Sequence, residues 1–353
     1  MIPTIEGVEA KRVTTGRLAT RVLFTGPEDG IPVLFLHGNL ASATWWEETM
    51  VRLPTGYRGI APDQRGYGDA DPEAKIDARR GLGDLADDAL ALLDALGVER
   101  AHVVGSSLGG NVVWHLLARA PGRLRSATLV APGSPYGFGA TEGLAGTPTT
   151  PDFAGSGAGL VNPELVGRLA QGDRSTDSPF SPRAALRTLV FGAGFVPARE
   201  EDLLSATLAV HLGEKDYPGD FVRSPHWPFV APGAWGPNNA LSPKYVLSPE
   251  EIVAATPKVP VLWVRGARDL AVSDAAASDP GNLGRVGLLP GWPGPEAYPP
   301  QPMVGQTRRV LERYAAAGGS FAEVVLPGSG HVPFLDDPDG FDRAFHAHLA
   351  RAR

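Results

Sequence analysis

Short, uninterrupted apolar runs alternate with segments of helical spacing along much of this 353-residue chain. The runs lie at residues 31–36, 57–62, 101–104 and 124–130, and helical spacing occupies residues 83–96 and 108–120. A run with no polar alternation is typical of a strand buried on both faces, as in a parallel sheet. Repeated strand-then-helix units therefore predict an α/β fold with right-handed crossovers.

The same rhythm breaks once and then returns. Residues 11–24 alternate around Gly16 and predict an antiparallel pair at one sheet edge, and further strand runs follow at 259–264 and 321–326, with a helix at 303–317 between them. We therefore predict a core of residues 1–132 and 256–353. Residues 133–255, rich in Gly, Pro, Ser and Thr, are predicted to form an inserted lid. We expect a second irregular insertion, at about 272–302, to cover part of the active site.

Charge and composition exclude several classes of function. The formal net charge is -7 without blocks of like charge, which disfavours nucleic acid and anionic lipid as partners. No basic segment precedes an apolar run at the start, and no stretch of about 18 apolar residues occurs, so we expect neither membrane insertion nor export and predict a cytoplasmic protein. The absence of cysteine excludes disulfides and thiolate chemistry, and neither H-E-x-x-H nor a suitably placed G-x-G-x-x-G occurs. We expect no cofactor and no metal, and the possibility of a homo-oligomer stays open.

The sequence G-S-S-L-G at residues 105–109 directly follows the strand at 101–104 and opens the next helix. A G-x-S-x-G match is common by chance in a glycine-rich chain, but a nucleophile elbow requires this position between a strand and a helix. Such a turn exposes the Ser107 hydroxyl above the sheet, beside the N–H groups of a helix N-terminus. Ser107 is therefore our candidate nucleophile, rather than a mere helix cap.

With three further landmarks in order, the chain resembles the α/β-hydrolase superfamily. H-G-N-L at residues 37–40 is similar to the oxyanion loop of that family, D-Q-R-G-Y-G at 63–68 is similar to its D-x-R-G-x-G turn, and G-H at 330–331 follows the last strand. The resemblance implies an eight-stranded, mostly parallel sheet with helices on both faces and an inserted helical lid.

The resemblance also implies a catalytic triad. Of the eight histidines, His331 alone lies in the loop where the family carries its general base. Asp269, after the strand at 259–264, is expected to orient that base, and Asp274 in the same loop is the second candidate. The order Ser107, Asp269, His331 agrees with that of the family.

The remaining site residues are the expected oxyanion donors and pocket walls. By resemblance, the backbone N–H groups of Leu108 and Asn39 form the oxyanion hole, with Leu40 as the alternative to Asn39. The Asn39 side chain either faces the pocket or satisfies its own turn. The candidate substrate-binding residues, with simple packing as the alternative, are Trp45, His226, Trp227 and Trp235.

A serine nucleophile excludes the branches of the superfamily that need Asp there, namely haloalkane dehalogenases and epoxide hydrolases. We predict a carboxylesterase or lactonase that cleaves a bulky, largely apolar small molecule through an acyl-enzyme. Carbon–carbon bond hydrolases and acyltransferases share the same triad, so these alternatives stay open. A ligand receptor built on a hydrolase fold is the non-enzyme alternative, although such a receptor has no need of all three triad groups.

Overall fold

One mixed sheet forms the centre of the computed structural model, which describes residues 2–352. Its strand order is β1-β2-β4-β3-β5-β6-β13-β14. The strands are β1 (Glu9–Thr14), β2 (Ala19–Thr25), β3 (Ile31–Leu36), β4 (Tyr57–Pro62), β5 (Ala101–Ser106), β6 (Leu124–Val130), β13 (Pro260–Gly266) and β14 (Ser320–Leu326). Only the β1–β2 and β2–β4 pairings in this sheet are antiparallel. The predicted parallel core with an antiparallel pair at one edge is therefore confirmed.

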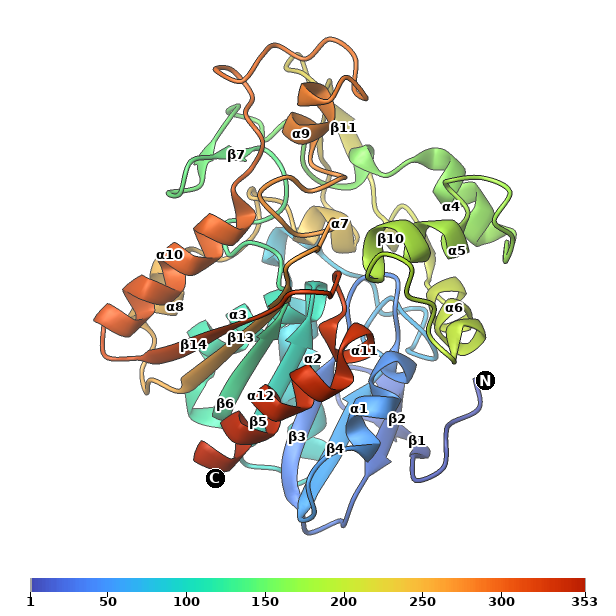
Figure 1. The fold of residues 1–353 in the computed structure, drawn as a ribbon, viewed down its shortest axis with the longest axis vertical. Helices are drawn as coiled ribbons and strands as arrows, with labels where there is room; N and C mark the ends of the chain where they lie inside the picture. Colours follow the sequence, from blue (N-terminus) through green and yellow to red (C-terminus); the bar gives the residue numbers. More distant parts are fainter. Residues whose placement is uncertain (1, 353) are drawn as a thin grey trace.

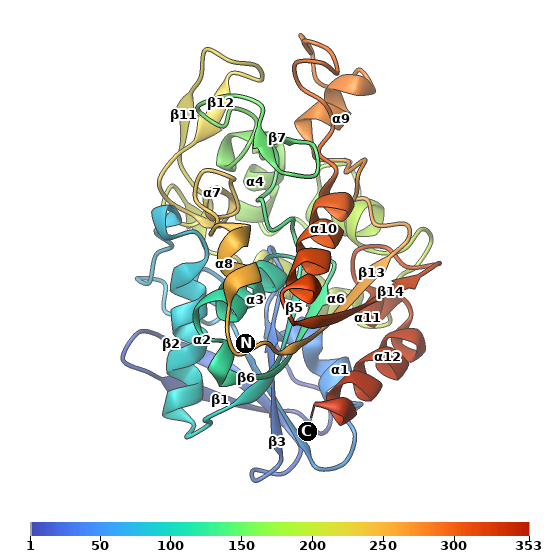
Figure 2. The same ribbon diagram turned by 90° about the vertical axis from the view of Figure 1, so that its left-hand side faces the viewer.

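Helices cover both faces of the sheet (Figures 1 and 2). On one face lie α2 (Gly83–Ala95), α3 (Leu108–Arg119), α8 (Pro249–Ala254) and α10 (Met303–Ala316), and on the other lie α1 (Glu47–Val51) and α12 (Pro338–Arg351). Each face has its own apolar cluster, because the central strands carry Val, Leu and Phe on both sides. The sequence-based boundaries of α2, α3 and α10 agree with the structure to within one residue.

Residues 133–255, here called the cap segment, join β6 to β13, and the part before α8 lies over the carboxyl ends of the strands (Figure 1). Their regular elements are β7 (Thr141–Glu142), β8 (Thr147–Pro148), the 3-10 helix η4 (Ala158–Leu160), α4 (Pro163–Ala170), α5 (Pro182–Ala185), the π-helix η5 (Leu186–Val190), α6 (Glu200–Leu208), β9 (Leu212–Gly213), β10 (Tyr217–Pro218), β11 (Phe221–Arg223), β12 (Val230–Pro232), α7 (Pro237–Ala240) and α8, which packs on α3 and α10. The segment predicted to form a helical lid is thus a mixture of short helices and two-stranded pieces, because proline and glycine recur along it.

One expected helix of the cap segment is shorter than its pattern. The pattern predicts a helix over residues 199–211, whereas α6 ends at Leu208. The chain leaves the helix there because the N–H of His211 donates to the carbonyl of Gly66, 2.9 Å away in the core. A tertiary contact therefore sets the end of this helix.

An ion pair and a hydrogen bond from an indole attach the cap segment to the core. Arg199 Nη1 lies 2.9 Å from Glu47 Oε2, and the Trp45 indole N–H donates to the carbonyl of Leu203 at 3.2 Å. Glu47 is fully buried, so this ion pair is shielded from water. Such contacts hold the cap segment close to the loop that follows β3.

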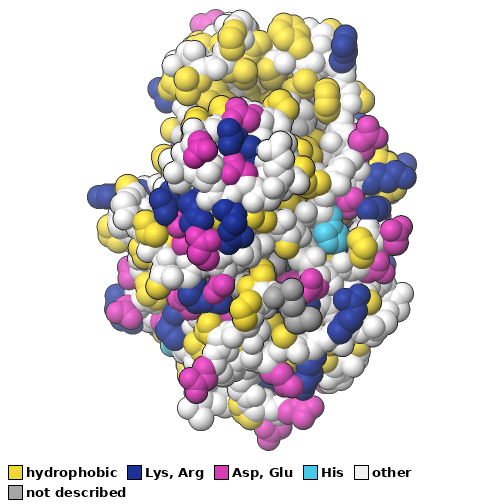
Figure 3. Space-filling view, turned by 90° about the vertical axis from the view of Figure 1, so that its right-hand side faces the viewer, with side chains coloured by type: hydrophobic (Ala, Val, Ile, Leu, Met, Phe, Trp, Pro, Cys, Tyr) yellow, Lys and Arg dark blue, Asp and Glu magenta, His cyan; other side chains and the backbone are white. Residues whose placement is uncertain are grey.

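The second insertion, with α9 (Pro280–Arg285), packs against the cap segment at the end of the molecule farthest from the sheet (Figure 2). The rings of Trp227 and Tyr298 meet edge to face at 4.8 Å, and the Tyr298 hydroxyl donates to the carbonyl of Ala154. Figure 3 shows hydrophobic side chains gathered at this same end.

Among residues 2–352, no helix is both long enough and apolar enough to span a bilayer.

Candidate active site

Ser107 stands in a strained turn between β5 and α3. Its φ of 54° and ψ of -119° lie outside the regions that non-glycine residues favour. The turn passes so close to its neighbours that a Cβ at Gly105 would lie 2.2 Å from the Gly109 oxygen, and one at Gly109 would lie 2.2 Å from the Leu36 oxygen. Only glycine fits at both positions, so the local sequence produces the strand–turn–helix geometry that presents Ser107.

The structure brings His331 and Asp269 together. His331 Nδ1 lies 2.8 Å from Asp269 Oδ2, and Asp269 Oδ1 accepts the N–H groups of Ala271 and Val272. These two backbone bonds fix the carboxylate, which in turn fixes the ring and places its proton on Nδ1. The Nε2 lone pair is then the one available to a hydroxyl.

Opposing effects act on the pKa of His331. Burial lowers it, but the charge of Asp269, the hydrogen bond to that carboxylate and the charge of Asp336 together outweigh burial and raise the pKa above the ordinary value of 6.5. The pocket environment therefore stabilises an imidazolium, the state that a general base reaches during the reaction.

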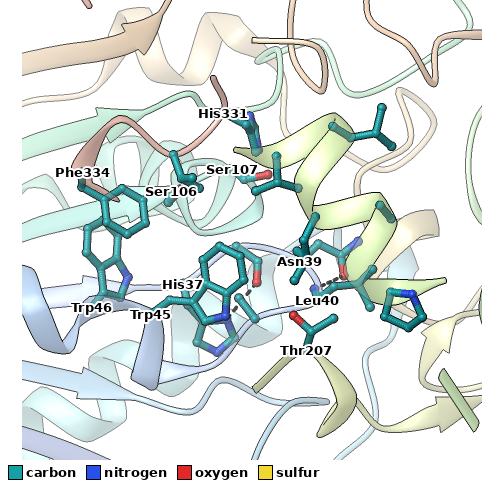
Figure 4. Close-up of a pocket in the computed structure, with 18 of the residues that line it drawn as sticks. His37, Asn39, Leu40, Trp45, Trp46, Ser106, Ser107, Thr207, His331 and Phe334 are labelled. Atoms are coloured by element: carbon teal, nitrogen blue, oxygen red, sulfur yellow. Dashed lines mark hydrogen bonds between the residues drawn. The ribbon is translucent and has the colours of Figure 1, made fainter. Parts of the chain in front are cut away.

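Ser107 and His331 both line the same pocket, and Figure 4 shows their side chains next to each other on one wall. Within residues 2–352, the Ser107 hydroxyl makes no hydrogen bond to the imidazole. Such bonds are often long in a free enzyme and shorten only when substrate binds. The arrangement has the parts that a serine nucleophile needs, namely an exposed hydroxyl, a base and a carboxylate that orients the base.

Asp274, the second candidate for the acid, lies elsewhere. Its Oδ1 accepts the N–H groups of Val304 and Gly305, at 2.8 and 3.3 Å, at the start of α10. It therefore caps a helix, while Asp269 contacts the histidine.

The loop after β3 approaches the serine from the opposite side. A Cβ at Gly38 would lie 3.1 Å from the Ser107 Cβ, so the two backbones nearly touch. Asn39 Oδ1 accepts the Leu40 N–H at 3.1 Å and the Tyr67 hydroxyl at 2.7 Å. The Leu40 N–H is thus already engaged, whereas the Asn39 N–H has no acceptor among residues 2–352. Of the two candidate donors, the N–H groups of Asn39 and Leu40, only that of Asn39 is therefore available to an oxyanion.

The Asn39 side chain satisfies its own turn and also reaches the cap segment. Besides its two bonds through Oδ1, its Nδ2 donates to Asn238 Oδ1 in α7 at 3.1 Å. The second donor expected from the sequence is the Leu108 N–H, at the first position of α3, where an α-helix offers no internal acceptor. Leu108 directly follows Ser107, and Asn39 lines the same pocket as Ser107.

His37 supports this loop. Its Nε2 accepts the Gln64 N–H at 2.9 Å, and its Nδ1 lies 2.8 Å from the Gly38 carbonyl oxygen. Burial lowers the pKa of His37 to about 4, so the ring is neutral near pH 7. Because both nitrogens are engaged with backbone, His37 has a structural role.

The turn at residues 63–68 is also held by internal contacts. Asp63 accepts the N–H groups of Ala43 and Asp69, each at 2.9 Å, and pairs with Arg21 at 3.1 Å. Arg65 pairs with Asp88 at 2.6 Å. These residues connect the sheet edge to the loop after β3 and lie behind the pocket wall.

The pocket itself is an apolar cavity of about 150 Å³. Its floor comes from the core and its far wall from the cap segment. The cap residues that line it are Leu165, Pro182, Ala185, Leu186, Leu189, Val190 and Thr207. No Lys, Arg, Asp or Glu is among the described residues that line the cavity, so it favours an uncharged group.

Of the four predicted substrate-binding residues, Trp45 alone lines this cavity, together with Trp46 and Phe334. Trp227 packs on Tyr298, His226 pairs with Asp152 at 3.0 Å, and Trp235 lies under Lys215. The structure therefore places His226, Trp227 and Trp235 away from the cavity, because the second insertion and surface charges take up these side chains. The second insertion, residues 272–302, was expected to cover part of the active site. None of its residues lines the cavity, because it packs on the outer side of the cap segment.

The sequence analysis did not predict the cavity-lining residues of the cap segment, which are Leu165, Pro182, Ala185, Leu186, Leu189, Val190 and Thr207. The helical spacing of the apolar positions 185, 186, 189 and 190 could have indicated a buried face, although nothing in the local sequence showed that this face lies toward Ser107.

Within residues 2–352, no group of three or more His, Asp or Glu side chains is arranged to hold a metal ion.

Comparison with known proteins agrees with this fold. The sequence pattern of the alpha/beta hydrolase fold family matches residues 31–283, so the chain belongs to that family. The solved structure of the carboxylesterase CesB (YbfK) from Bacillus subtilis superposes with a TM-score of 0.59 at 19% identity, over 98% of this chain and 92% of that one.

Curated relatives match over shorter stretches. The AB hydrolase superfamily protein YfhM of Bacillus subtilis (strain 168) is 37% identical over 118 residues, which are 33% of this chain and 41% of that protein. The 2-hydroxymuconate semialdehyde hydrolase of Pseudomonas sp. (strain CF600) is 36% identical over 118 residues, again 33% and 41% of the two chains. The alignments thus span about two fifths of these relatives.

Proposed function

We propose that this hydrolase cleaves carboxylic esters or lactones whose acyl part is apolar, through an acyl-enzyme on Ser107. The observation that carries the proposal is the opening of the Ser107, His331 and Asp269 arrangement into an apolar cavity. The carboxylesterase name of a structural neighbour is consistent with it.

The proposed reaction begins with attack of Ser107 Oγ on the ester carbonyl. His331 Nε2 takes the hydroxyl proton, and the Asn39 and Leu108 N–H groups stabilise the tetrahedral oxyanion, each contributing about 3 kcal/mol. His331 then protonates the leaving alcohol. A water molecule then attacks the acyl carbonyl and gives a proton to the same imidazole. The imidazolium returns that proton to Ser107 Oγ as the carbon–oxygen bond to Ser107 breaks, which releases the acid.

The size and lining of the cavity support an aryl acyl group or an aliphatic acyl chain of similar size. An apolar cavity of about 150 Å³ holds a group the size of benzene. A substrate bulkier than this must extend out of the cavity, past Leu189, which is 36% exposed at its wall. We therefore expect benzoyl or hexanoyl esters to be better substrates than acetates.

Carbon–carbon bond hydrolysis is less well supported. A relative of this chain is named for a muconate semialdehyde, which carries a carboxylate. A buried carboxylate needs a cationic partner, yet no Lys or Arg is among the described residues around the cavity. The ligand-receptor alternative predicts tight binding of an apolar ligand without turnover.

A panel of p-nitrophenyl esters and lactones, assayed with the wild type, Ser107→Ala and Ser205→Ala, tests the proposal. Ser205 lies on α6 and bonds to the Glu201 carbonyl, away from the cavity, so its variant controls for loss of a hydroxyl. The proposal expects hydrolysis that is lost in Ser107→Ala and kept in Ser205→Ala. Faster turnover of acetates than of benzoates or hexanoates would contradict the proposed acyl preference, and absence of hydrolysis would contradict the function.

A further inference from the structure

A second carboxylate lies beside the histidine loop. Asp336 ends the short helix α11 (Pro333–Asp336), five residues after His331. Its Oδ2 accepts the N–H of Gly330 at 2.7 Å, and its Oδ1 accepts the N–H of Gly192 at 3.1 Å. Gly330 precedes the histidine, whereas Gly192 belongs to the cap segment. One side chain thus joins two backbones that are far apart in the sequence.

A hydrogen bond and a close approach also hold these two backbones together. The His331 N–H donates to the carbonyl of Val190 at 2.8 Å. A Cβ at Gly330 would lie 2.8 Å from the nitrogen of Gly192, so only glycine allows this approach. The histidine loop is therefore seated on residues 190–192 of the cap segment, and Val190 also lines the cavity.

The charges that face the imidazole are both negative. Asp269 bonds to Nδ1, and Asp336 lies on the other side of the loop. Three arginines belong to the neighbouring elements. Arg52, which follows α1 and donates to the carbonyl of Phe334 in α11, pairs with Asp342 at 2.6 Å, and Arg187 of η5 pairs with Glu200. Arg268 precedes Asp269, and its N–H donates to the carbonyl of Ser329 at 3.0 Å. Burial raises the pKa of Asp336, whereas its bonds to Gly192 and Gly330 and the charge of His331 oppose that rise. Asp336 and Asp269 thus both add negative potential at His331.

We propose that Asp336 is a positioning residue for His331, which holds the histidine loop against the cap segment and adds its charge to that of Asp269. The inference rests on the proposed function, because it concerns the base of that reaction. The placement of the imidazole would then depend on a contact between the core and the cap segment, which Asp336 makes through Gly330 and Gly192. A displacement of about 1 Å at such a group can lower the rate about a hundredfold.

The adjacent residue provides a matched control. Asp337 is also acidic and also accepts a backbone N–H, that of Gly340 at 2.9 Å, but it does so as the N-cap of α12. Asp337→Asn therefore perturbs a similar bond in the same segment without touching the histidine loop.

The test is an NMR titration of the His331 ring in the full-length wild type, Asp336→Asn and Asp337→Asn, with the signal assigned by its loss in His331→Gln. Loss of the Asp336 charge removes one of the effects that raise the pKa of His331, so the titration should move to lower pH in Asp336→Asn and stay in place in Asp337→Asn. The midpoint of kcat/KM against pH should move in the same direction, and kcat for the best ester should fall at least tenfold.

A second variant separates charge from position. Asp336→Glu keeps the charge but lengthens the side chain by one methylene, so the His331 titration should stay near that of the wild type while kcat falls. It also serves if Asp336→Asn does not fold. An unchanged titration and kcat in Asp336→Asn, the same shift in Asp337→Asn, or wild-type kcat in Asp336→Glu would overturn the inference. The titration needs no turnover, so a protein that hydrolyses no ester would contradict the proposed function and still answer this question.

Discussion

His331 Nδ1 lies 2.8 Å from Asp269 Oδ2, although 62 residues separate the two in the chain. Parallel pairing of β13 with β14 brings their loops together, because both loops leave the same edge of the sheet. The second insertion fills about half of this separation, and it packs against the cap segment instead of lying between the two side chains. A long insertion is thus compatible with an intact pair of catalytic candidates.

Replacement of Asp269 by Asn should lower kcat by about 10⁴-fold without unfolding the protein. The amide keeps the shape but favours the wrong tautomer of His331 and removes the charge that stabilises the imidazolium. Steady-state kinetics with the best ester measures the effect. Asp274→Asn is the control, since it alters only the cap of α10, and a comparable loss in that variant would argue against Asp269 as the acid.

The pH dependence of activity should reflect the raised pKa of His331. The base must be neutral to accept the Ser107 proton, so kcat/KM should rise with pH through a midpoint above 6.5. The raised pKa also contributes folding stability that is fully present below about pH 6.5 and is lost as the pH rises through the folded pKa. A pH–rate profile with a midpoint below 6.5 would contradict this account.

Gly38→Ala should reduce kcat/KM at least tenfold while the protein stays folded. The added methyl group would lie 3.1 Å from Ser107 Cβ and 3.8 Å from its Oγ, so it displaces either the serine or the oxyanion loop. Gly122→Ala is the control, because a Cβ there meets nothing within 4 Å. Equal activity in the two variants would mean that this close approach has no catalytic importance.

Arg199→Ala should destabilise the protein by about 3 kcal/mol, because it leaves the buried Glu47 carboxylate without its cation. Burial already raises the pKa of Glu47 despite that cation, which indicates how costly an unpaired charge would be there. Chemical denaturation measures the change. Arg79→Ala, which breaks an exposed pair with Asp77, should leave the midpoint unchanged.

The sheet and the elbow were predictable because both depend on local patterns. Apolar runs such as residues 31–36 identify buried strands without knowledge of their partners. Gly105 is required by a contact with Gly109 within the turn itself, whereas Gly109 is required by the close approach of β3. Asp269 and His331 were expected from the resemblance to the α/β-hydrolase superfamily, since each follows a strand at the position where that family carries the residue. All these features survive insertions elsewhere in the chain.

The cavity walls were not predictable in the same way. Whether an aromatic or aliphatic side chain of the cap segment faces Ser107 depends on how that segment packs on the core and on the second insertion. Trp227 packs against Tyr298 of the second insertion, whereas Leu186 and Val190 line the cavity. Residue type alone favoured the tryptophan, and long-range packing reversed that choice.

Mass spectrometry of the protein quenched during turnover of a p-nitrophenyl ester tests the role of Ser107 most directly. The account predicts a burst of p-nitrophenol and an acyl group on the peptide that contains Ser107, accumulating further in Asp269→Asn if deacylation becomes the slower step. Steady hydrolysis with the acyl group on another residue, or undiminished hydrolysis by Ser107→Ala, would contradict the assignment of Ser107 as the nucleophile.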